Sequence, residues 1–180
     1  MLDKEVSKRA AAHLLVIEKL NRSCREKGCT VGQITADNVK DNSLPLSYPT
    51  DQLDACLSNQ TLTDFLQDLG SKPFTNGQLI VLKSRLDQIY PSGYPETVLT
   101  TLGAIANVCS EVDVAKWNIT SVDTLESLLS NDLATNLVQA VINKFVAGNA
   151  LNASALNIIG SPNICLLNST QLGSVTPSAI

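Results

Sequence analysis

The sequence predicts an all-α fold in which small helical units stack into a solenoid. Aromatic residues make up only 4% of the chain, and its apolar residues are mainly leucine, valine, isoleucine and alanine, a mixture that favours thin helix–helix layers over a β core. Helix-capping patterns open several short segments in succession. No sustained alternation of apolar and polar residues predicts a strand. The helices are too short and too numerous for a four-helix bundle.

Length and composition bound the class of protein. A chain of 180 residues suits one ordinary domain or several repeats of a small unit, and 44% hydrophobic with 17% charged residues argues against disorder. The net charge of −4 gives no general case for nucleic acid. Residues 1–40 hold eight basic and five acidic side chains, which we interpret as a solvated face. No apolar run reaches the roughly 18 residues of a membrane span.

The first predicted element is a helix over residues 2–27, whose apolar residues recur at helical spacing: Ala11, Leu14, Leu15, Ile17 and Leu20. Its acidic, mixed start does not resemble a signal peptide. We assign residues 1–28 to an N-terminal helix, either a preceding repeat or a precursor segment. Residues 29–180 form a helical repeat domain, which we interpret as part of a longer protein.

Later helices are predicted from their ends. Four pairs fit the capping box, in which a hydroxyl and a side chain three residues on satisfy the first backbone N–H groups: Thr30 and Gln33, Thr75 and Gln78, Ser110 and Asp113, Thr120 and Asp123. Pro95 predicts a helix over residues 96–108. Gly70, Gly148 and Gly160 stand where helices stop, and residues 136–148 carry an apolar stripe that ends at a glycine.

Loose internal similarity supports a solenoid. Four segments each place a hydroxyl-rich turn shortly before a leucine or isoleucine: residues 30–39, 59–69, 118–129 and 168–180. A solenoid needs such units, because each one buries its apolar face only against its neighbours.

Glycosylation patterns and cysteines predict an extracellular location. The acceptor pattern N-x-[ST] occurs at five positions, about twice the number expected by chance: Asn21, Asn59, Asn118, Asn152 and Asn168. The five cysteines form no C-x-x-C pair and the chain has one histidine, so we predict no metal site and no cofactor. Five thiols allow at most two internal disulfides, so one cysteine is left free or bonds outside this chain.

The only tryptophan, Trp117, directly precedes the acceptor asparagine Asn118. We expect a turn between two short helices here, in which Trp117 folds back over the helix that it ends while Asn118 points outward. Thr120 would then serve both as the acceptor hydroxyl and as a helix N-cap. The alternative is an unmodified site beside a half-exposed tryptophan.

Catalytic patterns are missing, so we predict that the chain is not an enzyme. His13 lies on or near the apolar stripe of the first helix, where a structural role is expected. No phosphate-binding or nucleophile motif occurs, and the carboxylate pairs have the in-helix spacing of solvated faces.

One region resembles a known family. The stretches "VLKSRLDQIYPSGYPETVLTTLG", "VAKWNITSVDTLESLL", "VINKFVAG" and "CLLNSTQLGSVTPSAI" resemble, in this order, the mesothelin family, which also includes stereocilin and otoancorin. The likeness covers residues 29–180. It implies a right-handed, armadillo-like superhelix of short helices. It also implies an extracellular protein, cleaved from a precursor and held at the membrane by a distant lipid anchor of the GPI type.

The resemblance also implies roles for single residues. Cys29 and Cys56 match a family disulfide, Cys165 matches a cysteine that pairs beyond residue 180, and Asn118 matches a glycosylation site. Tyr48 falls where the mucin-binding segment of the family has an aromatic residue, which makes it a candidate partner-binding residue. The remaining cysteines do not match the family pattern, so we predict a second disulfide between Cys24 and Cys109.

The function predicted from all of this is cell adhesion: a cell-surface module that binds a glycoprotein partner, of the mucin type or from the matrix. The alternative is a structural repeat segment of an extracellular matrix, gel or coat protein, in which Cys165 joins another chain.

Overall fold

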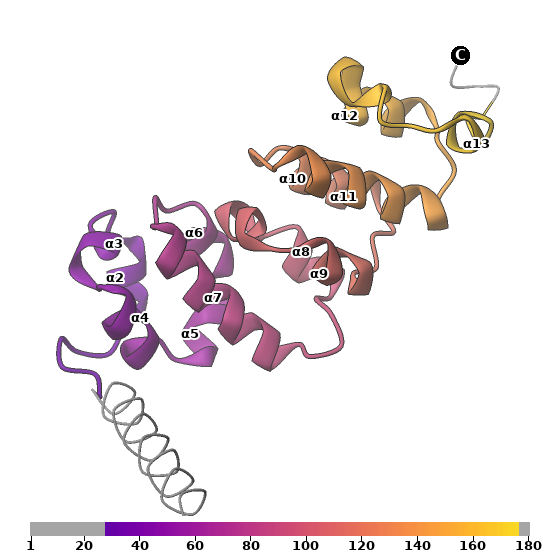
Figure 1. Cartoon of the computed structure of the whole chain (residues 1–180). Helices are drawn as coiled ribbons and strands as arrows, with labels where there is room; N and C mark the ends of the chain where they lie inside the picture. The colour runs from indigo at the N-terminus through magenta and orange to yellow at the C-terminus, as the bar shows by residue number, and fades with distance from the viewer. Residues whose placement is uncertain (1–27, 177–180) are drawn as a thin grey trace, which may run out of the picture.

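The computed structural model describes residues 28–176, and in this range the fold is helical (Figure 1). The one β-type contact there is an isolated bridge between Leu151 and Val175. The all-α prediction is therefore confirmed for the described residues. The helix predicted over residues 2–27, with His13 in it, lies outside them.

The helices are short and follow one another closely. In chain order they are α2 (Ala36–Lys40), α3 (Leu44–Ser47), α4 (Thr50–Cys56), α5 (Asn59–Asp64), α6 (Leu66–Gly70), α7 (Asn76–Ile89), α8 (Glu96–Leu99), the 3₁₀-helix η1 (Gly103–Val108), α9 (Glu111–Lys116), α10 (Val122–Leu129), α11 (Thr135–Gly148), α12 (Ala153–Ile164) and α13 (Ser169–Leu172).

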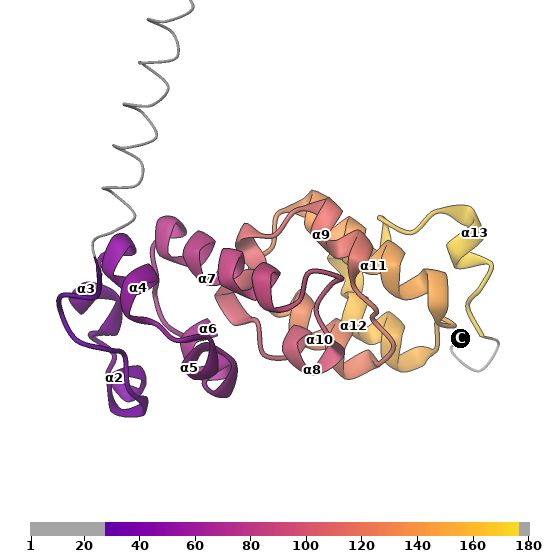
Figure 2. The ribbon, with the colours of Figure 1, turned by 90° about the horizontal axis from the view of Figure 1, so that it is seen from below.

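These helices form two rows that run side by side along the molecule (Figure 2). One row holds α4, α7, α9, α11 and α13; α4 packs on α7 and α9 on α11, and side chains join α7 to α9 and α11 to α13. The other row holds α2, α6, η1 with α8, α10 and α12, each packed on the next. Contacts of α7 with η1 and of α10 with α11 join the rows.

The core lies between the two rows and is built mainly from leucine. The fully buried side chains include Leu82 and Leu86 of α7, Ile105 of η1, Leu125 and Leu128 of α10, and Ile142 and Phe145 of α11. Aliphatic side chains of this size fill the thin space between short helices without large rings, which explains the low aromatic content.

Two of the four predicted capping boxes are confirmed. Thr75 caps α7 with Gln78, and Ser110 caps α9 with Asp113, each with both reciprocal hydrogen bonds. The other two predictions are wrong. Thr30 opens no helix and donates to Gln52 instead, while α10 is capped by Ser121, one residue after the predicted Thr120.

The helix predicted over residues 96–108 is interrupted. Pro95 is the N-cap of α8, but this helix ends at Leu99, and Gly103, the first residue of η1, takes a positive φ of 52°. A close approach of two backbones causes the break, because a Cβ on Gly103 would lie 2.4 Å from the carbonyl oxygen of Gly70.

The predicted glycine stops are found at the ends of two helices and within a third. Gly70 is the last residue of α6, and Gly148 is the last residue of α11. Gly160 has a φ of 69° and kinks α12 in its middle.

Candidate interaction surface

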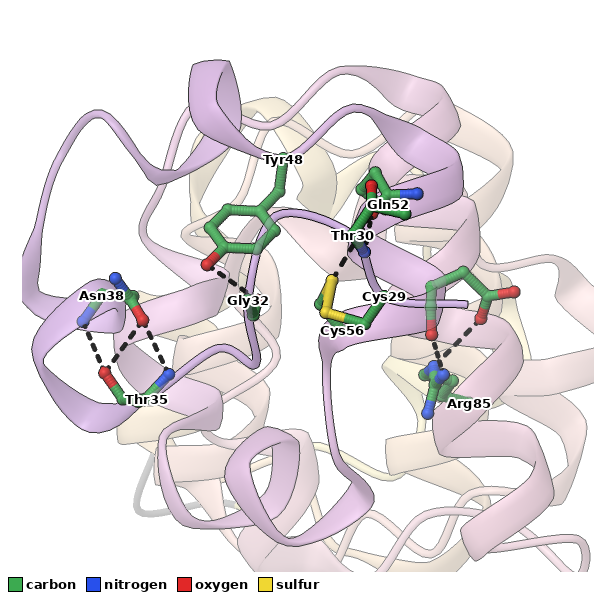
Figure 3. Close-up of a disulfide and its surroundings, with 10 residues drawn as sticks. Cys29, Thr30, Gly32, Thr35, Asn38, Tyr48, Gln52, Cys56 and Arg85 are labelled. Carbon is green, nitrogen blue, oxygen red and sulfur yellow. Dashed lines mark hydrogen bonds and ion pairs between the residues drawn. A yellow bond between two sulfur atoms is a disulfide. The ribbon is translucent and has the colours of Figure 1, made fainter. Parts of the chain in front are cut away.

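A disulfide between Cys29 and Cys56 closes the N-terminal end of the described chain, and it is the pair that the family resemblance implies (Figure 3). The Cα atoms are 4.8 Å apart. Gln52 reinforces the link, since its Oε1 accepts hydrogen bonds from the backbone N–H and the hydroxyl of Thr30, both at 2.9 Å. The Ile34 N–H donates to the carbonyl of Cys56 at 3.0 Å. Residues 29–34 are thereby fixed on α4.

Tyr48 belongs to this same structural unit. Its side chain is buried, and its hydroxyl donates to the carbonyl oxygen of Gly32 at 3.2 Å (Figure 3). Gln78 of α7 donates to the carbonyl of Tyr48 at 2.8 Å. In this structure Tyr48 packs the domain and presents no ring to a partner, so we do not include it in the interaction surface.

The predicted bridge between Cys24 and Cys109 is wrong, because Cys109 is a free, buried thiol whose Sγ donates to the carbonyl of Ile105 at 3.6 Å. It packs into the core at the end of η1, and burial raises its pKa to about 12, which keeps it protonated. Cys24 lies outside the described residues. Cys165 is free and exposed, and its bond to a cysteine outside this chain stays a prediction.

The Tyr-Pro-x-Gly-Tyr-Pro and Lys-Trp-Asn elements build one aromatic cluster between α7 and α9. The rings of Tyr94 and Trp117 stack at 6.0 Å between centroids, and Tyr90 meets Tyr94 edge-on at 6.3 Å. Both Tyr94 and Trp117 are buried. Gly93 has a φ of 115°, and a Cβ there would lie 2.5 Å from the carbonyl of Lys116, so the motif glycine lets this loop touch the end of α9.

Charged side chains of α7 and α9 lie beside this cluster and pair with one another. The Tyr94 hydroxyl donates to Asp87 Oδ1 at 2.6 Å, and Lys83 Nζ lies 2.8 Å from Asp87 and 3.1 Å from Asp113. Burial, together with the bond to Asp87, raises the pKa of Tyr94, so its hydroxyl stays a neutral donor. A cavity of about 200 Å³ borders the cluster, and the two carboxylates that line it, Asp87 and Asp113, are already partnered by Tyr94 and Lys83. We interpret the cluster as the support of α9.

The turn after α9 places Trp117 and Asn118 as predicted. Trp117 and Ile119 are each 3% exposed, while Asn118 between them is exposed, so successive side chains of the extended turn point to opposite sides. Glu96 holds the following residues, since its carboxylate accepts from the N–H groups of Thr120 and Ser121 at 2.9 and 2.8 Å and from the Thr120 hydroxyl. These bonds lower the pKa of Glu96 to about 2.

A groove with a volume of about 380 Å³ runs between α9 and α11. Alanines form part of it, and amide side chains of α11 stand along it at positions 136, 139 and 143. Asn136 donates to Glu111 at 2.9 Å, and Lys144 donates to the carbonyl of Ala115 at 2.7 Å, so both ends of the groove are bridged.

The amide side chains continue from α11 to α13. Asn143 Oδ1 accepts from Gln139 and from Gln171 of α13, both at 2.9 Å, which fixes the orientation of its amide. A second hollow of about 280 Å³ lies beside it, bordered by Thr170 and Ser174. We call this face, formed by Asn136, Gln139, Ala140, Asn143, Lys144, Ala147, Thr170, Gln171 and Ser174, the amide face.

Sequence reasoning missed the amide face. The signal was present, since residues 136, 139 and 143 have the i, i+3, i+7 spacing that places side chains on one side of a helix.

The other acceptor asparagines that the structure describes are exposed as well. Asn152 and Asn168 are N-caps of α12 and α13, and Asn59 accepts from Arg85 at 3.1 Å. Asn21 lies outside the described residues. Within residues 28–176, no cluster of three His, Cys, Asp or Glu side chains has the geometry of a metal site. No helix in this range has both the length and the apolar character of a membrane span.

A scan against known families matches the mesothelin family model over residues 1–180. The chain belongs to the mesothelin family. It is similar to the mesothelin-like protein of Mus musculus, with 34% identity over 84% of this chain, and to mesothelin of Rattus norvegicus, with 32% identity over 71%. Otoancorin of Mus musculus matches at 25% identity over 65% of the chain.

This chain spans only about a fifth of those mesothelin relatives, 22% of the first and 20% of the second. Mesothelin-family proteins are extracellular or cell-surface proteins, and the disulfide between Cys29 and Cys56 is consistent with such a location.

Proposed function

We propose that this mesothelin-family chain is an extracellular adhesion module at the cell surface that binds a glycoprotein partner through its amide face. The observation that carries the proposal is the amide face itself: side-chain amides and hydroxyls at fixed positions, with alanines between them. The two rows of helices serve it as a scaffold.

The chemistry of the amide face suits an uncharged, polar partner. Amides both donate and accept hydrogen bonds, so they complement sugar hydroxyls and peptide groups alike. Asn143 is the best example, because its Oδ1 holds two donors from within the fold and its Nδ2 is left to donate outward. A contact residue held in this way loses little conformational entropy on binding.

The groove holds one acidic and one basic side chain. Glu111 accepts a hydrogen bond from Asn136, and Lys144 donates to the carbonyl of Ala115, so each charged group is already oriented within the fold. This arrangement favours a neutral glycoprotein surface over nucleic acid, which demands a basic stripe.

We propose further that the two rows continue in the longer protein as a right-handed, armadillo-like superhelix. The strongest contacts join helices close together in the chain, which is the pattern of a repeat array. Small-angle scattering of the longer protein tests this, because a solenoid gives an elongated profile whose length grows with each added repeat.

The binding proposal is tested on the disulfide-bonded, glycosylated protein with immobilised mucin-type and other cell-surface glycoproteins. The double variant Gln139→Ala, Asn143→Ala should weaken binding about tenfold or more, as expected when hydrogen-bonding contacts at an interface are lost. Gln67→Ala is the matched control, since Gln67 is an exposed amide on α6 in the other row. No partner at micromolar affinity, or equal binding by the double variant, would refute the assignment.

The structural alternative rests on Cys165, the exposed free thiol. If the chain is a segment of a matrix, gel or coat, mass spectrometry of unreduced native material finds Cys165 joined to another chain. If Cys165 pairs within its own protein, adhesion is favoured.

A further inference from the structure

The acceptor asparagine Asn118 lies at the rim of a hollow of its own. This hollow, of about 260 Å³, is bounded by residues 118–120 on one side and by the last turn of α11 on the other. Lys144, Ala147, Gly148 and Asn149 line that second side. The hollow is slightly smaller than the range in which drug-sized ligands bind, so its size suits one sugar ring.

Asn118 differs from the other described acceptor asparagines. The side chains of Asn59, Asn152 and Asn168 each accept a hydrogen bond within the fold. The amide of Asn118 has no hydrogen-bond partner within residues 28–176, and it is exposed beside an open hollow. Nothing in the described fold uses this side chain.

The walls of the hollow are rigid. Asn149 Nδ2 donates to the carbonyls of Ile119 and Phe145 at 2.9 and 2.8 Å, which joins the turn directly to the end of α11. Trp117 and Ile119 are buried on either side of Asn118, and Glu96 holds Thr120. The backbone of Asn118 is therefore held at the edge of the hollow.

The chemistry of the lining suits a sugar. Ala147 and Gly148 are exposed and small, so they leave room for the flat face of a ring. Asn149 keeps its Oδ1 as an acceptor while its amide nitrogen is used, and the Lys144 ammonium has donors beyond the one given to Ala115. Hydroxyls and an acetamido group need acceptors and donors of this kind.

We propose that the first N-acetylglucosamine of a glycan on Asn118 seats in this hollow and bridges the turn at residues 118–120 to the last turn of α11. The sugar is attached when Asn118 Nδ2 forms a bond to C1 of the N-acetylglucosamine. The bond between this C1 and the lipid diphosphate carrier breaks, the lipid diphosphate leaves, and Nδ2 loses one proton. Once attached, the sugar is tethered at the rim, so its effective concentration in the hollow is high. The glycan thus becomes part of the packing between the two helices.

The inference rests on the proposed extracellular location and not on partner binding. It is tested with Asn118→Gln in two preparations: secreted protein trimmed by an endoglycosidase to single sugars, and sugar-free protein from a host that does not glycosylate. In the trimmed protein the variant should lower Tm by on the order of 3 °C. In the sugar-free protein it should change nothing, because the free amide has no partner to lose.

A second variant fills the hollow beside Asn118 with a larger side chain. Ala147→Leu should lower the Tm of the trimmed protein and leave the sugar-free protein unchanged, since Ala147 is exposed. Hydrogen exchange should show residues 118–121 and 144–149 protected by the single sugar, and residues 59–64, which hold another acceptor site, unaffected.

Equal Tm for Asn118→Gln and the parent in trimmed protein would overturn the proposal. An effect of the same size in both preparations would also overturn it, since the amide itself would then be responsible, and so would an unoccupied Asn118 in secreted protein. If the binding survey found no glycoprotein partner but Asn118→Gln lowered Tm only in the trimmed protein, the adhesion proposal would be refuted and the glycan proposal would stand.

Discussion

Glu96 offers a quantitative test of how the turn after α9 is held. Its carboxylate accepts from two backbone N–H groups and one hydroxyl at residues 120 and 121, and so holds the two residues that precede α10 from a different part of the chain. Hydrogen bonds to a charged group at a partly exposed site contribute about 0.5–1 kcal/mol each. We therefore expect Glu96→Ala to lower the free energy of unfolding by about 2 kcal/mol, near the upper end for a lost helix cap.

The pH dependence of the free energy of unfolding gives a second test of the role of Glu96. The hydrogen bonds lower the pKa of Glu96 from 4.5 to about 2 in the folded protein. Its contribution is therefore complete above pH 4.5, and it is lost as the pH falls from 4.5 toward 2. Glu96→Gln keeps an acceptor oxygen but no charge, so it should cost about half as much at neutral pH. It should also remove this part of the acid sensitivity.

Urea unfolding, followed by far-UV circular dichroism at several pH values between 2 and 7, measures both effects. The matched control is Glu126→Gln, because Glu126 is an exposed carboxylate on α10 outside this network. If Glu96→Gln has the stability of the parent at pH 7 and the same loss below pH 4.5, the carboxylate does not hold the turn and the reasoning is wrong.

Three further predictions concern the disulfide, one glycine and the free thiols. Replacing Cys29 and Cys56 by serine should cost about 3.5 kcal/mol, from the loop entropy of a 27-residue separation, and a loss under 1 kcal/mol in urea unfolding would contradict this. Gly93→Ala should lower Tm by several degrees in a thermal scan, since φ is 115° and the new Cβ meets the Lys116 carbonyl; an unchanged Tm would mean that the loop relaxes freely. In native protein, iodoacetamide should label Cys165 and spare Cys109, whose burial raises its pKa to about 12, and peptide mapping that finds Cys109 labelled first would refute its placement.

Local rules succeeded where a local interaction decides the structure. The capping boxes at Thr75 and Ser110 were predictable because both partners lie within four residues of each other. The division between buried Trp117 and exposed Asn118 followed from the geometry of a turn.

Prediction failed where a segment far away in the sequence determines the local structure. Thr30 has the residues of a capping box, but the buried amide of Gln52 competes for its donors. The break before η1 depends on a backbone contact between residues 33 positions apart, Gly70 and Gly103, which no local pattern reveals. The amide residues of α11 could be recognised from their spacing in the sequence, but the face that they form with α9 and α13 depends on these helices lying side by side.

The contact between Gly70 and Gly103 has a mechanical consequence for the array. At this contact the backbones of the two helices touch directly, and no side chain lies between them. A methyl group added at Gly103 would lie 2.4 Å from the carbonyl oxygen of Gly70, so α6 and η1 would have to move apart to admit it. The spacing of these two helices is therefore set by the absence of a side chain, and no change of rotamer can restore it.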